Sequence, residues 1–160
     1  MQTIKVGMAD LQAGKDPCML TTLGLGSCVG ISLYDRTTRI SGMAHIMLPS
    51  SKQARDNTNI AKFADTGIVY LLDKMIKMGA NRISITAKLA GGAQMFAFKE
   101  TSDIMRIGDR NVDASKEILG MLRIPILAEE CRGTYGRTIE LYSSDGRLLI
   151  KTIGHGIKSV

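Results

Sequence analysis

A cysteine inside a glycine-rich segment is the feature of this sequence that most suggests chemistry. Residues 21–30 read TTLGLGSCVG, with Cys28 at the start of a β-rich run. A deprotonated thiol is a nucleophile, and glycines allow backbone N–H groups to approach a developing oxyanion closely. Cys28 is therefore a candidate nucleophile for acyl transfer, and Gly26 and Ser27 are candidate substrate-binding residues beside it.

Two other interpretations of this glycine-rich segment fit less well. Glycines at positions 24, 26 and 30 do not follow the G-x-G-x-x-G spacing of a dinucleotide loop, and no helix follows to hold a pyrophosphate. The order G-S-C-V-G, with His155 late in the chain, matches a nucleophile elbow. An elbow also requires a helix after the nucleophile, so it remains a distant alternative.

A predicted β-hairpin places a histidine next to Cys28. Residues 29–34 and 39–48 are β-rich and flank the turn-like residues 35–38. With that turn, opposed residues have numbers that sum to 73, so Cys28 faces His45, with Cβ atoms roughly 4.5–5.5 Å apart. A neighbouring imidazole lowers a thiol pKa and can protonate an amine leaving group. A loop of odd length would place the two side chains on opposite faces.

Structural roles are the alternative for each of these residues. Free cysteine often acts as a small buried hydrophobe, and His45 lies in a run that is apolar on both faces. Cys18 and Cys131 have no histidine partner in any predicted register, so we expect structural thiols there. We expect His155, flanked by glycines, to be solvated. No cluster has metal-ligand spacing, so no metal is predicted.

The elements around these residues predict a layered α/β sandwich with a mixed sheet. Helical spacing of apolar residues over 60–76 indicates a helix ending near Gly79, and a second helix should begin near Asn111 as its cap. The remaining segments favour strands at 4–11, 19–23, 83–89 and 125–130, and a C-terminal hairpin of 138–142 and 147–153.

Composition limits the class of protein. With 160 residues, 44% of them hydrophobic, the chain is typical of one globular domain covering residues 1–160. Three cysteines without C-x-x-C spacing favour a reducing cytoplasm, and we expect neither export nor membrane spanning. The charge of +6 suits an acidic partner, but scattered basic residues and few aromatics argue against nucleic acid.

Several motifs together resemble one known family. The segments LTTLGLGSCVGISLYD and GMAHIMLP, then AKFAD (61–65), AKLAGGAQMF (87–96), IGDRNV (107–112) and GRTIE (136–140), are similar to the CheD family of bacterial chemotaxis, which are chemoreceptor glutamine deamidases. The resemblance covers the chain from Ile4 to about Ile153. It implies a three-layer α/β/α sandwich around a mixed, largely antiparallel sheet.

The resemblance also implies roles for individual residues. The nucleophile falls on Cys28, the general acid/base on His45 and the orienting threonine on Thr22. Other matched segments suggest that Gly91, Gly92, Arg110 and Asn111 line a substrate groove; the local alternatives are a strand-ending turn and a helix cap.

The implied activity is hydrolysis of receptor Gln side-chain amides to Glu and ammonia through a Cys thioester, without a cofactor. Expected partners are methyl-accepting chemoreceptors, as the protein substrate, and a CheC-type phosphatase. Contact with membranes is expected only through the receptors. The alternative is a non-catalytic adaptor that binds and stimulates that phosphatase.

Overall fold

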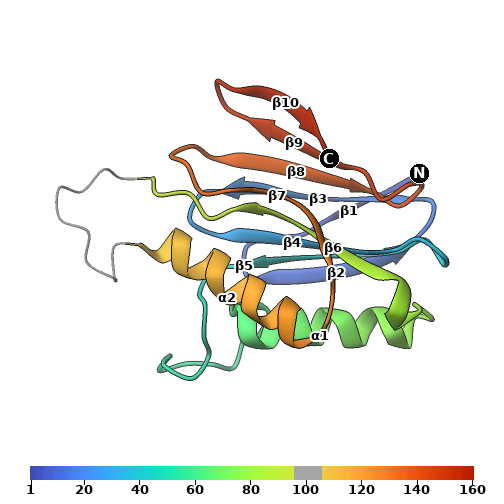
Figure 1. Cartoon of the computed structure of the whole chain (residues 1–160), viewed down its shortest axis with the longest axis horizontal. Helices are drawn as coiled ribbons and strands as arrows, with labels where there is room; N and C mark the ends of the chain where they lie inside the picture. Colours follow the sequence, from blue (N-terminus) through green and yellow to red (C-terminus); the bar gives the residue numbers. More distant parts are fainter. Residues whose placement is uncertain (96–105) are drawn as a thin grey trace.

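Two five-stranded sheets and two α-helices account for most of the part of the chain that the structure describes (Figure 1). The structure is a computed structural model that describes residues 1–95 and 106–160. The first sheet has the strand order β1-β3-β8-β9-β10, and the second has the order β2-β5-β4-β6-β7. The elements are β1 (Gln2–Lys5), β2 (Asp10–Lys15), β3 (Cys18–Leu25), β4 (Val29–Asp35), β5 (Ile40–Ile46), the 3-10 helix η1 (Ile60–Lys62), α1 (Ala64–Lys77), the 3-10 helix η2 (Arg82–Ser84), β6 (Ile85–Gly91), α2 (Ile107–Met121), β7 (Ile126–Cys131), β8 (Arg137–Tyr142), β9 (Leu148–Thr152) and β10 (Gly156–Ser159).

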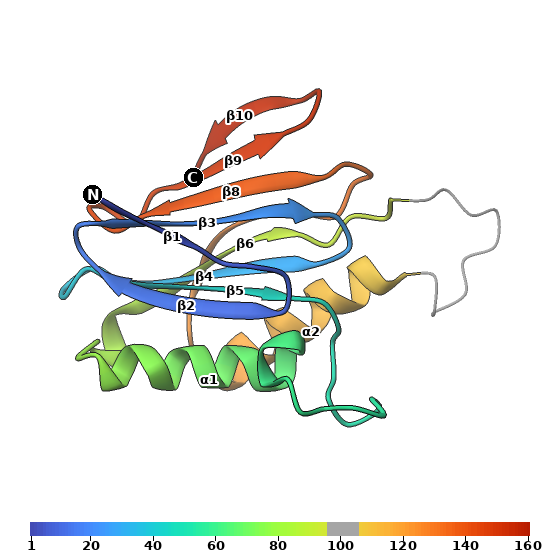
Figure 2. The ribbon, with the colours of Figure 1, turned by 180° about the vertical axis from the view of Figure 1, so that it is seen from behind.

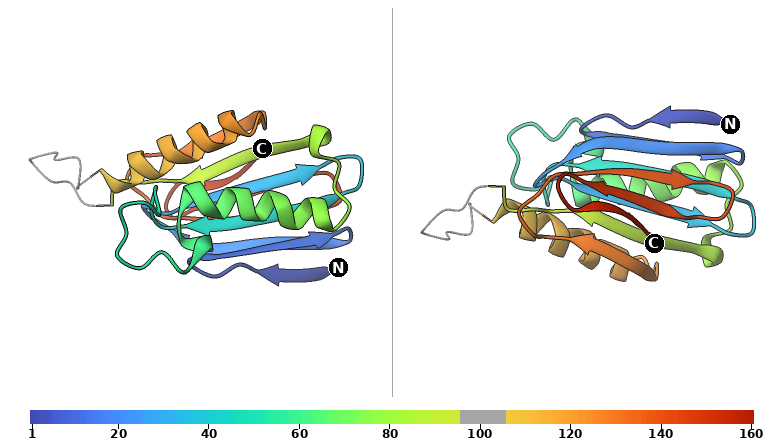
Figure 3. Two further views of the ribbon diagram at one scale, coloured as in Figure 1. Left: turned by 90° about the horizontal axis from the view of Figure 1, so that it is seen from below. Right: turned by 90° about the horizontal axis from the view of Figure 1, so that it is seen from above.

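The predicted α/β class is confirmed, with a difference in how the layers are ordered. Both helices cover the same face of the second sheet, and the first sheet packs on its other face (Figures 2 and 3). The three layers are therefore sheet, sheet and helices, in place of one sheet between two helical layers. Each sheet is mixed and largely antiparallel, as expected, with β1–β3 and β6–β7 as the parallel pairs.

Burial on both faces explains why the second sheet is central. Every residue of β4 and β5 is buried. Side chains on one face join the cluster under α1 and α2, which contains Ile31, Leu33, Ala44 and Ile46. Side chains on the other face meet the first sheet, where Cys28 and Met43 pack with Leu25 and Ile139. The second cluster therefore fills the space between the two sheets.

The β4–β5 hairpin has a different register from the predicted one. Asp35 pairs with Ile40, so the turn is residues 36–39 and opposed residues sum to 75 instead of 73. Asp35 stays in the strand because its carboxylate accepts hydrogen bonds from Thr37 and Thr38, while Arg39 adopts a left-handed conformation with φ 58°. The turn has the predicted even length, so each side chain keeps its predicted face.

Other element boundaries also differ from expectation. The predicted strand at 4–11 is two strands separated by a turn in which Ala9 has φ 56°. Residues 60–76 form η1 and then α1, with an extended Phe63 between them. Helix α2 begins at Ile107, so Asn111 lies inside it and does not cap it. The C-terminal hairpin is confirmed, and β10 was not predicted.

Within the described residues, no helix is long and apolar enough to cross a membrane.

Candidate active site

Thr22 and His45 join the two sheets through a buried hydrogen bond. Thr22 lies in β3 of the first sheet and His45 in β5 of the second, and each side chain is almost wholly buried. Thr22 Oγ1 lies 2.7 Å from His45 Nδ1 and donates its own hydrogen to the carbonyl oxygen of Val6, also at 2.7 Å. The imidazole is therefore attached to both sheets.

These two bonds determine the tautomer of His45. A hydroxyl has one hydrogen, and a carbonyl can only accept, so the Thr22 hydrogen is committed to Val6. The Nδ1 of His45 must then carry a hydrogen and donate it to Thr22 Oγ1, which assigns the tautomer from the hydrogen-bond network. The other nitrogen, Nε2, has a free lone pair, and it has no hydrogen-bond partner in the described part of the chain. His45 is thus prepared to accept a proton.

Cys28 shares a sheet face with His45 but is not directly opposite it. Gly30 is the residue opposite His45, which makes Cys28 its diagonal neighbour two residues earlier. Diagonal neighbours are roughly 7–8 Å apart and remain within reach of long or aromatic side chains. A Cβ at Gly30 would lie 2.6 Å from Ile139 Cδ1, so a side chain at this position would require Ile139 to move. The prediction that Cys28 directly faces His45 is wrong, and the prediction of a shared face is confirmed.

Burial shifts both groups toward their neutral forms. Desolvation raises the pKa of the Cys28 thiol above its ordinary value and lowers the pKa of the His45 imidazole. This differs from the expected thiol pKa, which a neighbouring imidazolium would have lowered. The resting pair at neutral pH is therefore an uncharged thiol and an uncharged imidazole.

Three hydrogen bonds from residues 92, 93 and 111 hold the turn that carries Cys28, and we call the side of the turn that they contact its rear. The carbonyl oxygens of Gly26, Ser27 and Cys28 accept from Ala93 N at 2.8 Å, Asn111 Nδ2 at 2.9 Å and Gly92 N at 2.8 Å, respectively. Gly91 and Gly92 both adopt positive φ, 109° and 69°. A Cβ at Gly91 would collide with the Cys28 carbonyl oxygen, so the backbone approaches this closely only because Gly91 has no side chain.

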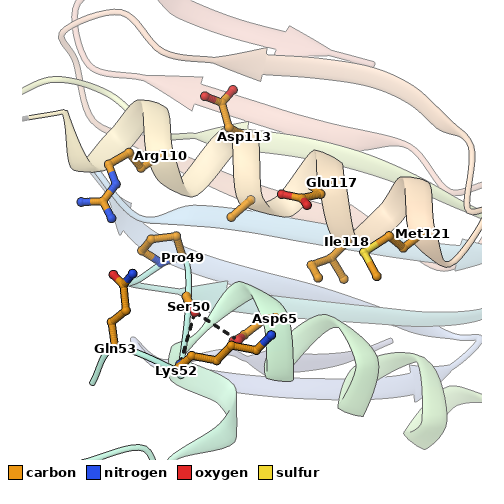
Figure 4. A pocket seen from close by; sticks show the side chains of 11 residues that line it. Pro49, Ser50, Lys52, Gln53, Asp65, Arg110, Asp113, Glu117, Ile118 and Met121 are labelled. Atoms are coloured by element: carbon orange, nitrogen blue, oxygen red, sulfur yellow. Dashed lines mark hydrogen bonds between the residues drawn. The ribbon is translucent and has the colours of Figure 1, made fainter. Parts of the chain in front are cut away.

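The predicted groove residues fall into two places. Gly91, Gly92 and Asn111 contact the rear of the Cys28 turn, and Asn111 has none of its surface exposed. Arg110 instead lines a separate hollow of about 520 Å³ between α2 and residues 49–53 (Figure 4). Gly26 and Ser27 are half-buried in the turn itself. Phe96, the last residue of one family-like motif, lies outside the described residues.

The remaining cysteines and His155 occupy other positions in the fold: Cys131 of β7 pairs with Gly91 of β6, on the helix side of the second sheet. Cys18 is buried, and its backbone N–H donates to Ser143 Oγ. Burial, above all, raises the pKa of Cys131 to about 11. His155 lies in an exposed turn with its ring 4.3 Å from that of Tyr135. Over residues 1–95 and 106–160, no group of three or more His, Cys, Asp or Glu side chains is placed to hold a metal ion.

Two contributors to the site were not found from the sequence. The carbonyl of Val6 fixes the Thr22 hydroxyl, and the backbone of Ala93 holds the Cys28 turn. Both act through backbone atoms, which carry no residue-type signal. The proximity of Val6 to Thr22 follows from the parallel pairing of β1 with β3, which only the fold reveals.

Comparisons with known proteins agree on one family. The family model described as CheD chemotactic sensory transduction matches residues 47–152. A protein of Caldanaerobacter subterraneus subsp. tengcongensis named probable chemoreceptor glutamine deamidase CheD is 60% identical, with 98% of this chain and 97% of the relative covered. A protein of Lachnoclostridium phytofermentans with the same name is 55% identical, with 99% of each chain covered. Chemoreceptor glutamine deamidase CheD of Halalkalibacterium halodurans is 51% identical over 98% of each chain. This chain therefore belongs to the CheD family.

Proposed function

We propose that this CheD-family protein hydrolyses glutamine side-chain amides of chemoreceptors to glutamate, with Cys28 as nucleophile, His45 as general base and acid, and Thr22 as the residue that orients His45. The names of its relatives support the activity and the substrate class. The observation that carries the residue assignment is the buried Nε2 of His45. It has no hydrogen-bond partner among residues 1–95 and 106–160, and its lone pair is fixed by the hydrogen bonds from His45 to Thr22 and from Thr22 to Val6.

The Cys28 thiol makes no hydrogen bond to His45 in the free protein. The reaction begins when substrate binding brings the thiol within hydrogen-bond reach and its proton passes to His45 Nε2. The sulfur then forms a bond with the carboxamide carbon, and the carbonyl oxygen becomes an oxyanion. His45 returns the proton to the amide nitrogen, the C–N bond breaks and ammonia leaves a thioester. His45 next takes a proton from water, whose oxygen attacks the thioester. Glutamate is released, and the proton returns to the thiolate.

Burial suits this sequence of proton transfers. Because desolvation lowers the pKa of His45, the imidazole is a free base at neutral pH. Because desolvation raises the pKa of Cys28, the thiol keeps its proton until substrate is present. The charged pair forms only while the substrate amide excludes water and the glycine-rich turn stabilises the oxyanion.

The partners and location follow from the proposed substrate. Three free thiols fit a reducing cytoplasm, where the protein would meet receptor segments that face the cell interior. A net charge of +6 favours encounter with an acidic receptor surface. Binding of a CheC-type phosphatase, and substrate contacts by Gly26, Ser27, Gly91, Gly92 and Arg110, stay predictions that rest on the family resemblance.

The test is mass spectrometry of a recombinant receptor fragment after incubation with the protein. Cys28→Ala should abolish conversion of Gln to Glu, because removal of the nucleophile stops the covalent route. Cys131→Ala is the matched control, since its thiol packs on the helix side of the second sheet, opposite the face of Cys28, and it should remain active. Conversion by folded Cys28→Ala would overturn the assignment, and failure of the wild-type protein to convert any receptor glutamine would favour the adaptor.

A further inference from the structure

A buried side chain of helix α2, that of Asn111, is hydrogen-bonded to the turn that carries Cys28. Asn111 is fully buried, and its Nδ2 donates to two carbonyl oxygens, those of Ser27 and Met47, each at 2.9 Å. Ser27 precedes the nucleophile, and Met47 follows His45 by two residues. One amide group therefore holds both the turn that carries the nucleophile and the end of the strand that carries the base.

The chemistry of Asn111 explains why an amide is present. Both hydrogens of Nδ2 are used by carbonyls, which can only accept, so the orientation of the amide is fixed. Its Oδ1 is buried and has no hydrogen-bond partner among the described residues. A buried polar atom without a partner costs roughly 1–3 kcal/mol. Both Nδ2 hydrogens of Asn111 are therefore bonded, while its Oδ1 is left without a partner. This pattern indicates that the side chain acts here as a hydrogen-bond donor.

The close approach of α2 is what allows Asn111 to reach the turn. A Cβ at Gly108, three residues before Asn111, would lie 2.5 Å from the carbonyl oxygen of Ala93 and 2.6 Å from that of Gly92. The first turns of α2 therefore rest on the same backbone, Gly92 and Ala93, that donates to the carbonyls of Cys28 and Gly26. The helix and the turn form one packed unit.

Because a peptide group is rigid, the hydrogen bond to the Ser27 carbonyl also sets the direction of the Cys28 N–H group. The only cis peptide among the described residues is Asp16–Pro17, so the peptides of the turn are trans. In a trans peptide the N–H points opposite to the C=O. The carbonyl of Ser27 points toward Asn111 of α2, so the N–H group of Cys28, on the same peptide, points away from α2. That direction is the side of the sheet on which Cys28 and His45 lie.

We propose that Asn111 is a positioning residue for the oxyanion: by holding the Ser27 carbonyl from behind, it aims the Cys28 N–H at the developing charge on the substrate carbonyl oxygen. The proposal rests on the proposed deamidase function and deepens it. It replaces the expectation that Asn111 lines the substrate groove, because a side chain with no exposed surface cannot touch the substrate.

The experiment compares two reactions of the same thiol. Deamidation passes through an oxyanion, whereas alkylation of Cys28 by iodoacetamide does not. In Asn111→Leu, which keeps similar bulk without the donors, kcat for deamidation should fall about ten- to hundredfold, a share of the effect of losing one oxyanion donor. The KM and the alkylation rate of Cys28 should stay close to wild type, because Thr22 still orients the His45 imidazole and Asn111 does not bond to the thiol or to the imidazole.

Controls separate positioning from loss of structure. Ser115→Ala removes a buried hydroxyl one turn further along α2 that donates to the Asn111 carbonyl at 2.7 Å. It should lower thermal stability without a change in kcat. Asn111→Ser, a smaller change, provides a second variant if Asn111→Leu does not fold, and rates are expressed per folded molecule from circular dichroism.

Two results would overturn the proposal. One is a wild-type kcat in folded Asn111→Leu or Asn111→Ser. The other is an equal fall in deamidation and alkylation, which would mean that Asn111 supports the thiol–imidazole pair and not the oxyanion. Neither result would affect the assignment of Cys28, which the Cys28→Ala variant tests separately.

Discussion

Removal of the Thr22 hydroxyl tests whether the tautomer of His45 matters for catalysis. Thr22→Val keeps the shape of the side chain but leaves the Nδ1–H of His45 without an acceptor and the Val6 carbonyl without its Thr22 donor. The imidazole can then move its hydrogen to Nε2, where it blocks the lone pair that we propose accepts the Cys28 proton. Thr22→Ser keeps the hydroxyl and should preserve both bonds.

The size of the effect follows from the two orphaned groups. Each buried polar group left without a partner costs about 1–3 kcal/mol, so Thr22→Val should lower the free energy of unfolding by at least that much. If one such interaction favours the active tautomer, about 1–3 kcal/mol corresponds to a fall in kcat/KM of about 5- to 150-fold. Thr22→Ser should stay close to wild type in both measurements.

The neighbouring Thr21 provides a matched control. Its hydroxyl donates to the Ile139 carbonyl at 2.9 Å and does not contact His45. The measurements are ammonia release from a receptor fragment, for kcat/KM, and urea unfolding, for stability. Thr21→Val should lose stability but not activity per folded molecule. The reasoning fails if Thr22→Val loses no more activity than Thr21→Val, or if Thr22→Ser is as inactive as Thr22→Val.

Three further predictions concern pH, thiol reactivity and the turn. The pKa of His45 is lowered and that of Cys28 is raised, so kcat/KM should fall only below pH 6.5 on the acid side and only above pH 9.0 on the alkaline side; a narrow optimum near pH 7 would contradict this. Iodoacetamide should label Cys28 in the free protein faster as pH rises, and rapid labelling at mildly acidic pH would instead indicate a resting ion pair. Gly91→Ala should lower the free energy of unfolding by about 1–3 kcal/mol or more, because φ is 109° and the new Cβ meets the Cys28 carbonyl. Gly120→Ala, in open space on α2, should not destabilise in the same urea titration.

The shared face of Cys28 and His45 could be predicted because it depends only on whether the turn between the strands has an even or an odd number of residues. A turn of even length keeps both side chains on one face whether opposed residues sum to 73 or 75. The register itself depended on Asp35, whose burial alone would raise its pKa but whose hydrogen bonds from Thr38, Thr37 and Asn81 lower it to about 2. Those bonds keep Asp35 in the strand, and Asn81 is too distant in sequence to be recognised as a partner.

The role of Asn111 could not be predicted from the sequence, for a different reason. An asparagine before an apolar helical pattern is typical of a cap, and the sequence does not show that α2 begins earlier, at Ile107. The pairing of strands into two sheets was equally hidden, because β3 reaches β8 across more than 100 residues. Local patterns predict elements, whereas contacts of this separation depend on the packing of the whole chain.

In the proposed mechanism, the hydrogen bond between Thr22 and His45 makes activity depend on the distance between the two sheets. The oxygen belongs to one sheet and the nitrogen to the other, 2.7 Å apart. A widening of about 1 Å would exceed the range of a hydrogen bond, although it would leave the strand pairing within each sheet intact. On gentle heating or in dilute urea, activity should therefore disappear while the far-ultraviolet circular dichroism is still native. Such an enzyme would lose activity when the packing between its two sheets loosens, before the strands within either sheet separate.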